Sequence, residues 1–200
     1  MKIVIAEDQQ MLREALTTLL QLEGDIEVVA EVADGDSAWE AITRYQPDIC
    51  LLDIEMPIMN GLELARKIRS LSSSMKIIIV TTFARPGYLE QAIELQVEGY
   101  LLKDEPIDFL IDAIRRVARG ERVMSPELAK TMLHWEKNPL TEREIDVLRL
   151  ANKGMTTEQI SKSLYLSKGT VRNYLSSAIQ KLGVETRQQA LKKALDKGWI

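Results

Sequence analysis

Three carboxylates stand where apolar runs of this sequence stop. Asp53 follows the run Ile49–Leu52, and Glu7 with Asp8 follows an apolar run near the beginning of the chain. Like charges held close together require either protonation or a bound cation. Hard oxygen ligands that leave room for water suit Mg²⁺, which commonly takes one or two carboxylates together with phosphate oxygens. These residues therefore predict a magnesium site, provided that the fold brings them together.

A hydroxyl and an ammonium group end two other apolar runs. Thr81 is the last residue of Lys76–Thr81, and Lys103 follows Gly99–Leu102. Both groups suit the oxygens of a phosphoryl group, and together with a carboxylate and a metal ion they are the parts of an aspartyl-phosphate site with Asp53 as acceptor. A single aspartate would more often be a helix cap or a solvated charge. Suitable residues at several strand ends favour the site.

Short apolar runs alternate with helical patterns over residues 1–120. The runs fit strands, at Lys2–Ala6, Glu27–Val32, Ile49–Leu52, Lys76–Thr81 and Gly99–Leu102. Amphipathic patterns lie between and after them, at about Gln9–Leu22, Ser37–Tyr45, Leu62–Leu71, Tyr88–Leu95 and Ile107–Arg119. Such βα repeats predict an α/β domain with a doubly wound, five-stranded parallel sheet of flavodoxin-like order. Ligands of such sheets bind at the carboxyl ends of the strands, where the reactive residues stand.

Residues 121–138 interrupt this alternation and are expected to form a linker. Ser125-Pro126-Glu127 is typical of a helix start, so we expect one short helix within the linker. His134, the only histidine, has no Cys or His companions for a metal site and is interpreted as a surface or packing residue.

Only helix patterns follow, over residues 139–200. Thr141–Glu144 is a capping box that opens a first helix. A short helix from about Thr156, a tight turn and a longer helix from Ser167 to about Leu182 are typical of a helix-turn-helix. A fourth helix begins at Thr186. We expect an all-α, four-helix DNA-binding domain.

Charge separates the two halves of the chain. Residues 137–200 hold 12 Lys and Arg against 6 Asp and Glu, whereas residues 1–136 hold 14 against 24. An acidic domain joined to one that prefers a polyanion explains the split, and a chance distribution of solvated charge is the alternative. No apolar run is long enough to cross a bilayer, and Cys50 has no partner for a disulfide. We expect a cytoplasmic protein without direct membrane insertion.

Both halves resemble known domains. Residues 1–120 resemble the CheY-like receiver domain of bacterial two-component response regulators, at Glu7-Asp8, Asp53–Pro57, Gly61, Thr81 and Gly99–Lys103. The stretch LTEREIDVLRLANKGMTTEQISKSLYLSKGTVRNYLSSAIQKLGV is similar to the DNA-binding domain of the NarL/FixJ (LuxR-type) group. TTFARPGY and GTVRNY look most like the DesR subgroup of that family, which is tied to the control of membrane lipids.

The receiver resemblance implies roles for the acidic residues. Asp53 would accept a phosphoryl group from a cognate sensor histidine kinase. Glu7, Asp8 and Asp53, with the backbone carbonyl of Glu55, would hold Mg²⁺. Lys103 would pair with the phosphoryl group.

The resemblance also implies a switch. Thr81 would swing its hydroxyl onto the phosphoryl group, and Tyr100 would turn inward as it moves. An ordinary packed tyrosine is the alternative for Tyr100. Glu55 and Thr82 flank the path of the attacking water, where they would tune the lifetime of the phosphate. Asp104 stands where many receivers have a proline.

The helix from Ser167 to about Leu182 is expected to enter the major groove with its amino-terminal half. Arg172 and Asn173 match positions where this family reads bases, and Ser176 stands where many relatives carry a lysine. The side chains suited to phosphate contacts are Lys168, Thr170, Tyr174 and Lys181.

Surplus apolar residues on two receiver helices predict a homodimer that phosphorylation promotes. On the first helix one core stripe leaves out Met11, and on the last receiver helix it leaves out Ile107, Phe109 and Ile111. Wider burial inside the monomer or against the linker is the alternative. A dimer would favour two half-sites in the DNA.

These observations predict a phosphorylation-controlled transcriptional regulator rather than an enzyme. A hydrolase using Asp53 is one rival, but it leaves the basic helical domain unexplained. A regulator with a degenerate receiver that binds DNA constitutively is the other. The filled acidic, hydroxyl and lysine positions argue against it.

Overall fold

The chain forms two compact units in the computed structural model, which describes residues 1–71, 74–82, 85–131 and 137–200. The first contains the strands β1 (Lys2–Ala6), β2 (Glu27–Val32), β3 (Ile49–Asp53), β4 (Lys76–Thr81), β5 (Gly99–Leu102) and β6 (Val123–Met124). Its helices are α1 (Gln10–Gln21), α2 (Gly35–Tyr45), α3 (Gly61–Ser70), α4 (Pro86–Glu94), α5 (Ile107–Ala118) and α6 (Pro126–Thr131). The second consists of α7 (Glu142–Asn152), α8 (Thr157–Ser163), α9 (Lys168–Lys181) and α10 (Arg187–Asp196).

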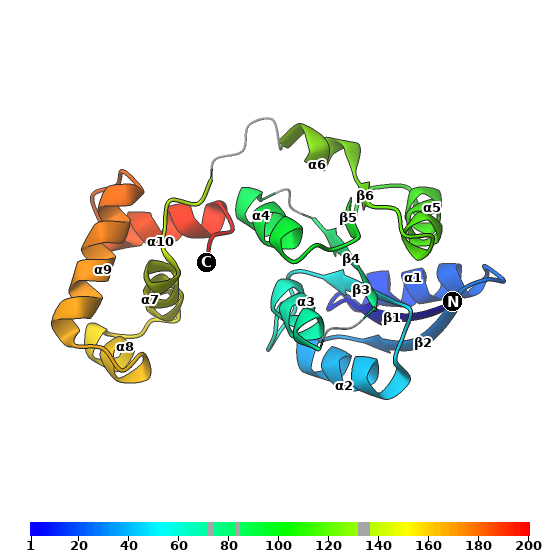
Figure 1. The fold of residues 1–200 in the computed structure, drawn as a ribbon, viewed down its shortest axis with the longest axis horizontal. Coiled ribbons are helices and arrows are strands. Elements are labelled where there is room, and N and C mark those ends of the chain that lie inside the picture. The colour runs from blue at the N-terminus through cyan, green and yellow to red at the C-terminus, as the bar shows by residue number, and fades with distance from the viewer. Residues whose placement is uncertain (72–73, 83–84, 132–136) are drawn as a thin grey trace. The chain divides into compact units, whose positions relative to one another are not determined.

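The described strands form one sheet in the order β2-β1-β3-β4-β5-β6, and every neighbouring pair is parallel. β3 lies in the middle and is buried along its whole length, as expected for a strand covered on both faces. Figure 1 shows α1 and α5 on one side of the sheet and α2 and α3 on the other. The doubly wound α/β fold predicted from the sequence is confirmed.

The sheet has one strand more than the sequence predicts. β6 is only two residues long and pairs with β5 through the backbone: the amide of Val123 donates to Glu98 at 2.9 Å, and that of Ser125 to Tyr100 at 3.1 Å. A strand of two residues is too short to show an alternation of apolar and polar side chains. Its pairing is made by backbone groups and does not depend on the types of its side chains. Part of the expected linker is thus integral to the sheet.

α6 begins at Pro126, where the sequence predicts a helix start. Its first turn follows Ser125, which is fully buried and whose hydroxyl accepts a hydrogen bond from the amide of Leu102 at 3.0 Å. The interpretation of His134 lies outside the described residues.

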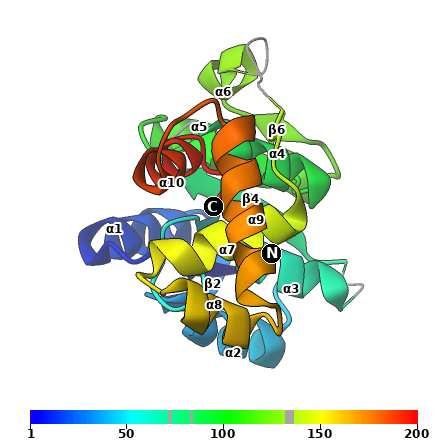
Figure 2. The ribbon, with the colours of Figure 1, turned by 90° about the vertical axis from the view of Figure 1, so that its left-hand side faces the viewer.

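Side-chain caps begin every helix of the second unit. The threonines Thr141, Thr156 and Thr186 close capping boxes at α7, α8 and α10, and Ser167 caps α9. α9 packs beside α7 and α8 in Figures 1 and 2. Residues such as Val147, Ile160 and Val171 fill the core. The predicted four-helix arrangement with a helix-turn-helix at α8 and α9 is confirmed.

Candidate phosphoacceptor and nucleic-acid sites

The three predicted carboxylates meet at the carboxyl edge of the sheet. β1 and β3 are neighbours in register, with Ala6 opposite Leu52, so the residues that follow them stand side by side. Carboxylate oxygens of Glu7, Asp8 and Asp53 lie within 4.8 Å of one another. Glu7 and Asp53 are buried, with 2% and 4% of their surface exposed, whereas Asp8 is open to solvent.

The start of α3 packs closely against the backbone at Asp53. The amide of Gly61, at the start of α3, donates to the carbonyl of Ile54 at 3.0 Å. A Cβ atom at Gly61 would lie 2.0 Å from the backbone oxygen of Asp53, far inside van der Waals contact. Glycine is therefore required here for space, because α3 begins directly against the strand that ends at Asp53.

Lys103 lies between the two buried carboxylates. Its Nζ is 2.8 Å from Glu7 and 3.1 Å from Asp53, and its side chain is 6% exposed. Burial raises the pKa of Glu7, and the hydrogen bond from Lys103 opposes this only in part. Burial by itself would lower the pKa of Lys103, but Glu7 and Asp53 outweigh it and raise that pKa overall. One ammonium among three carboxylates leaves an excess of negative charge, which suits a divalent cation.

Thr81, Thr82 and Glu55 lie at the same edge of the sheet, and Tyr100 lies farther back on β5. Thr81 ends β4, is fully buried, and its carbonyl accepts from the amide of Lys103 at 2.9 Å. Thr82 and Glu55 are exposed at the rim. Tyr100 lies on β5 and is 2% exposed, so its ring already faces inward in this structure.

The exposed face of α9 carries polar side chains from several of the predicted DNA contacts. Lys168, Arg172, Asn173 and Ser176 are exposed, while Val171 and Leu175 on the other side are buried in the core. Positions spaced by three or four residues share one face of a helix: Lys168, Arg172 and Ser176 are spaced by four, and Asn173 lies three residues before Ser176. Thr170 and Tyr174 are half-buried, and the Thr170 hydroxyl lies 2.8 Å from that of Ser167.

Lys181 differs from Lys168 because the carboxylate that it pairs with is buried in the domain. Its Nζ donates to Glu144 of α7 at 2.8 Å, and the Ser177 hydroxyl donates to the same carboxylate at 2.6 Å. Glu144 is 3% exposed. Burial alone would raise the pKa of Glu144, but the hydrogen bonds from Lys181 and Ser177 lower it to about 2. The capping box in the sequence predicts Glu144 as part of a helix cap. Nothing in the sequence indicates its distant partners, Ser177 and Lys181.

Comparison with known proteins assigns both units. Residues 3–115 match the response regulator receiver domain, and residues 138–194 match the bacterial regulatory proteins of the luxR family. This chain belongs to the LuxR-type response regulators.

Two relatives match over almost their whole length. The chain is 50% identical to the uncharacterized transcriptional regulatory protein YvfU of Bacillus subtilis, covering 100% of this chain and 99% of that protein. It is 48% identical to the transcriptional regulatory protein DesR of the same organism, covering 99% and 98%. A structure of two RcsB dimers bound to two parallel DNAs matches with a TM-score of 0.67 and 26% identity, covering 98% of each chain. This response regulator thus joins a receiver domain to a LuxR-type DNA-binding domain and is a phosphorylation-controlled transcriptional regulator.

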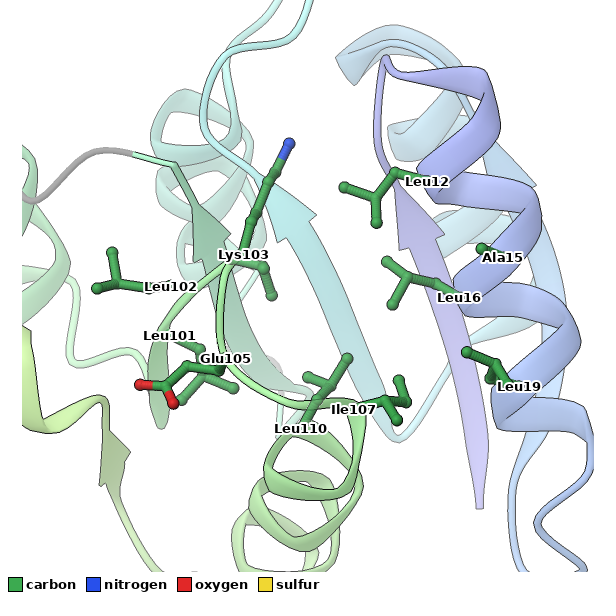
Figure 3. A pocket seen from close by; sticks show the side chains of 11 residues that line it. Leu12, Ala15, Leu16, Leu19, Leu101, Leu102, Lys103, Glu105, Ile107 and Leu110 are labelled. Atoms are coloured by element: carbon green, nitrogen blue, oxygen red, sulfur yellow. The ribbon is translucent and has the colours of Figure 1, made fainter.

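An apolar pocket lies between α1 and α5 of this response regulator. It measures about 170 Å³, and Figure 3 shows Leu12 and Leu16 of α1 pointing into it, across from Ile107 and Leu110 of α5. Lys103 also borders it, so the pocket lies near the carboxylates of Glu7 and Asp53.

The predicted dimer residues divide into three groups. Met11 is 86% exposed on α1, whereas Ile107 and Phe109 are half-buried against the core. Ile111 is 8% exposed and belongs to the core, so the expectation that it lies outside the core stripe is wrong. α5 buries Leu110 as well as Ile111, a wider apolar face than one stripe, because a helix packed on a sheet turns about 100° of its surface inward. In the part of the chain that the structure describes, no helix has the length and apolar content needed to cross a membrane.

Proposed function

We propose that Asp53 accepts a phosphoryl group from a sensor histidine kinase. The observation that carries this is its position: a nearly buried carboxylate, 3.1 Å from the Lys103 ammonium and beside two further carboxylates. An oxygen of Asp53 attacks phosphorus, the bond from phosphorus to the kinase histidine breaks, and that histidine leaves with the electron pair. Lys103 then pairs with the phosphoryl oxygens and Thr81 donates its hydroxyl to them.

Mg²⁺ fits the same group of residues. Glu7, Asp8 and Asp53 supply hard oxygen ligands that are close together and carry more negative charge than Lys103 neutralises. The backbone carbonyl of Glu55 completes the proposed set. When bound, the cation offsets charge on the carboxylates and on the incoming phosphoryl group.

The output is proposed to be DNA binding by a homodimer in the cytoplasm. The exposed polar face of α9 supports major-groove binding, with Arg172 and Asn173 at base edges and Lys168 at phosphates. RcsB is a relative that binds DNA as dimers. The pocket between α1 and α5, next to the exposed Met11, supports these two helices as the dimer surface. Tyr100 is proposed to move with Thr81 when Thr81 moves onto the phosphoryl group. Thr82 and Glu55 are proposed to tune the lifetime of the phosphate, because they flank the path of the attacking water.

Incubation with Mg²⁺ and phosphoramidate, followed by intact mass measurement, tests the acceptor. The parent gains one phosphoryl group, and Asp53→Asn does not. Asp36→Asn, an exposed carboxylate at the start of α2, is the matched control and gains the group. An equal adduct on Asp53→Asn overturns the assignment of the acceptor.

A sizing column tests the dimer on the same samples. Phosphorylation shifts the parent toward a dimer, and Met11→Glu abolishes the shift without loss of the adduct. Leu71→Glu is the control, because Leu71 is 54% exposed at the end of α3, on the other side of the sheet. Dimerisation by Met11→Glu as strong as that of the parent contradicts the proposed surface.

A further inference from the structure

Tyr165, in the turn between α8 and α9, combines a strained backbone with a fully exposed ring. Its φ is 55°, in the left-handed region that bulky residues rarely adopt, and it is 96% exposed. The amide of Leu166 donates to Ser161 at 2.9 Å and that of Tyr165 to Lys162 at 3.4 Å. This is the Schellman pattern, whose left-handed position favours glycine. The exposed ring makes almost no contact that offsets the strain.

The other helices of the same unit are each followed by a glycine in the left-handed conformation. Gly154 after α7, Gly183 after α9 and Gly198 after α10 all have positive φ, at 78°, 62° and 69°. Within residues 137–200, only α8 has a non-glycine residue in this conformation. A bulky residue in a position that glycine would occupy without strain points to function.

The surroundings of Tyr165 indicate what its ring meets. Lys162 and Lys168 flank the turn with 78% and 55% of their side chains exposed, and Glu158 pairs with both. Ser167, two residues on, caps α9. Two ammonium groups against one carboxylate, at the end of α9 that carries the base-reading positions, favour a polyanion over an apolar protein surface.

We propose that Tyr165 contacts the DNA backbone at the edge of the groove that α9 enters, which rests on the proposed DNA-binding role of α9. The phenol hydroxyl donates to a phosphate oxygen and the ring packs against the neighbouring deoxyribose. Such a contact fixes the depth and register of α9 but reads no base. It carries no charge and so releases no counterion, unlike a contact from Lys168.

Tyr165→Gly separates this role from a structural one. In the full chain treated with Mg²⁺ and phosphoramidate, binding to a fluorescent random-sequence duplex of ~30 bp is measured by anisotropy at several salt concentrations. The variant binds roughly tenfold more weakly than the parent. Tyr165→Phe, which keeps the ring but lacks the hydroxyl, has an affinity between those of the parent and Tyr165→Gly. The slope of log affinity against log salt is unchanged. The urea midpoint of unfolding stays equal or rises, because glycine relieves the strain.

Gln46→Gly is the matched control. Gln46 follows α2 in the receiver with a φ of 46°, so the same backbone relief occurs there without a change in DNA affinity. Unchanged affinity of Tyr165→Gly, or a lowered urea midpoint, overturns the proposal. Unchanged affinity with lost control of the target promoter in cells assigns Tyr165 to a protein partner instead. If the parent binds DNA equally well without phosphorylation, the proposed switch fails while the effect of Tyr165→Gly still decides this inference.

Discussion

The ion-paired cluster of Glu144, Ser177 and Lys181 makes the stability of the DNA-binding domain depend on pH. Glu144→Gln keeps the shape of the side chain and removes the charge that accepts both hydrogen bonds. The pKa of Glu144 falls from its ordinary 4.5 to about 2, and at about 1.4 kcal/mol per pKa unit this is worth roughly 3 kcal/mol at neutral pH. Lys181 is 35% exposed. Solvent around it weakens the pair, and we expect a loss of about 2 kcal/mol.

The sign of the pH dependence follows from the lowered pKa. A carboxylate with a folded-state pKa below its unfolded value stabilises the fold fully above the unfolded value, and this stabilisation is lost as pH falls toward the folded value. The difference between the parent and Glu144→Gln is therefore complete above pH 4.5 and shrinks toward zero near pH 2.

Tryptophan fluorescence during urea unfolding measures this in the full chain. With Trp39 and Trp135 replaced by phenylalanine, Trp199, which is 4% exposed in the core of the DNA-binding domain, is the one remaining reporter. Glu142→Gln in the same first turn of α7 is the control, because Glu142 is exposed. A difference between parent and Glu144→Gln that is the same at acid and neutral pH refutes the reasoning.

Two further substitutions test the receiver. Gly61→Ala forces a Cβ against the Asp53 carbonyl, so we expect it to cost about 1–3 kcal/mol and to slow phosphorylation of Asp53, as measured by intact mass. Gly24→Ala, where the added atom meets nothing, is its control. Ser125→Ala leaves the part-buried amide of Leu102 without its acceptor and lowers the free energy of unfolding by about 1–3 kcal/mol, as measured by urea titration. An unchanged titration would show that this bond contributes nothing to stability.

The strands were predictable because each is a short apolar run bounded by polar or turn residues. β1, β2, β4 and β5 have the predicted bounds, and β3 extends by one residue to Asp53. The helices of the DNA-binding domain were predictable from their caps, such as Thr141 and Ser167, which are local signals. β6 has no comparable signal, since it is specified by backbone pairing with β5 alone.

Side-chain partners far apart in sequence were the part that could not be predicted. Lys181 has the type and place of a phosphate contact, yet it donates to Glu144, 37 residues away. Ile111 falls outside the narrow stripe that periodicity defines, yet the wide contact of α5 with the sheet buries it. In both cases the packing of two elements decides whether the side chain is buried or paired. The sequence of one element does not show which other element it packs against.

The sequence by itself determined the family and the two-part architecture and indicated the candidate reactive residues, because these depend on residue types at strand ends and on short-range periodicity and capping. The tertiary structure decided which of these residues meet. It placed the Lys103 ammonium between Glu7 and Asp53, gave Gly61 its close approach to Asp53, and left Tyr165 strained and exposed beside α9. The first two are contacts at the edge of the sheet and between a strand and a helix. They depend on strand order and helix packing, which residue types alone do not determine.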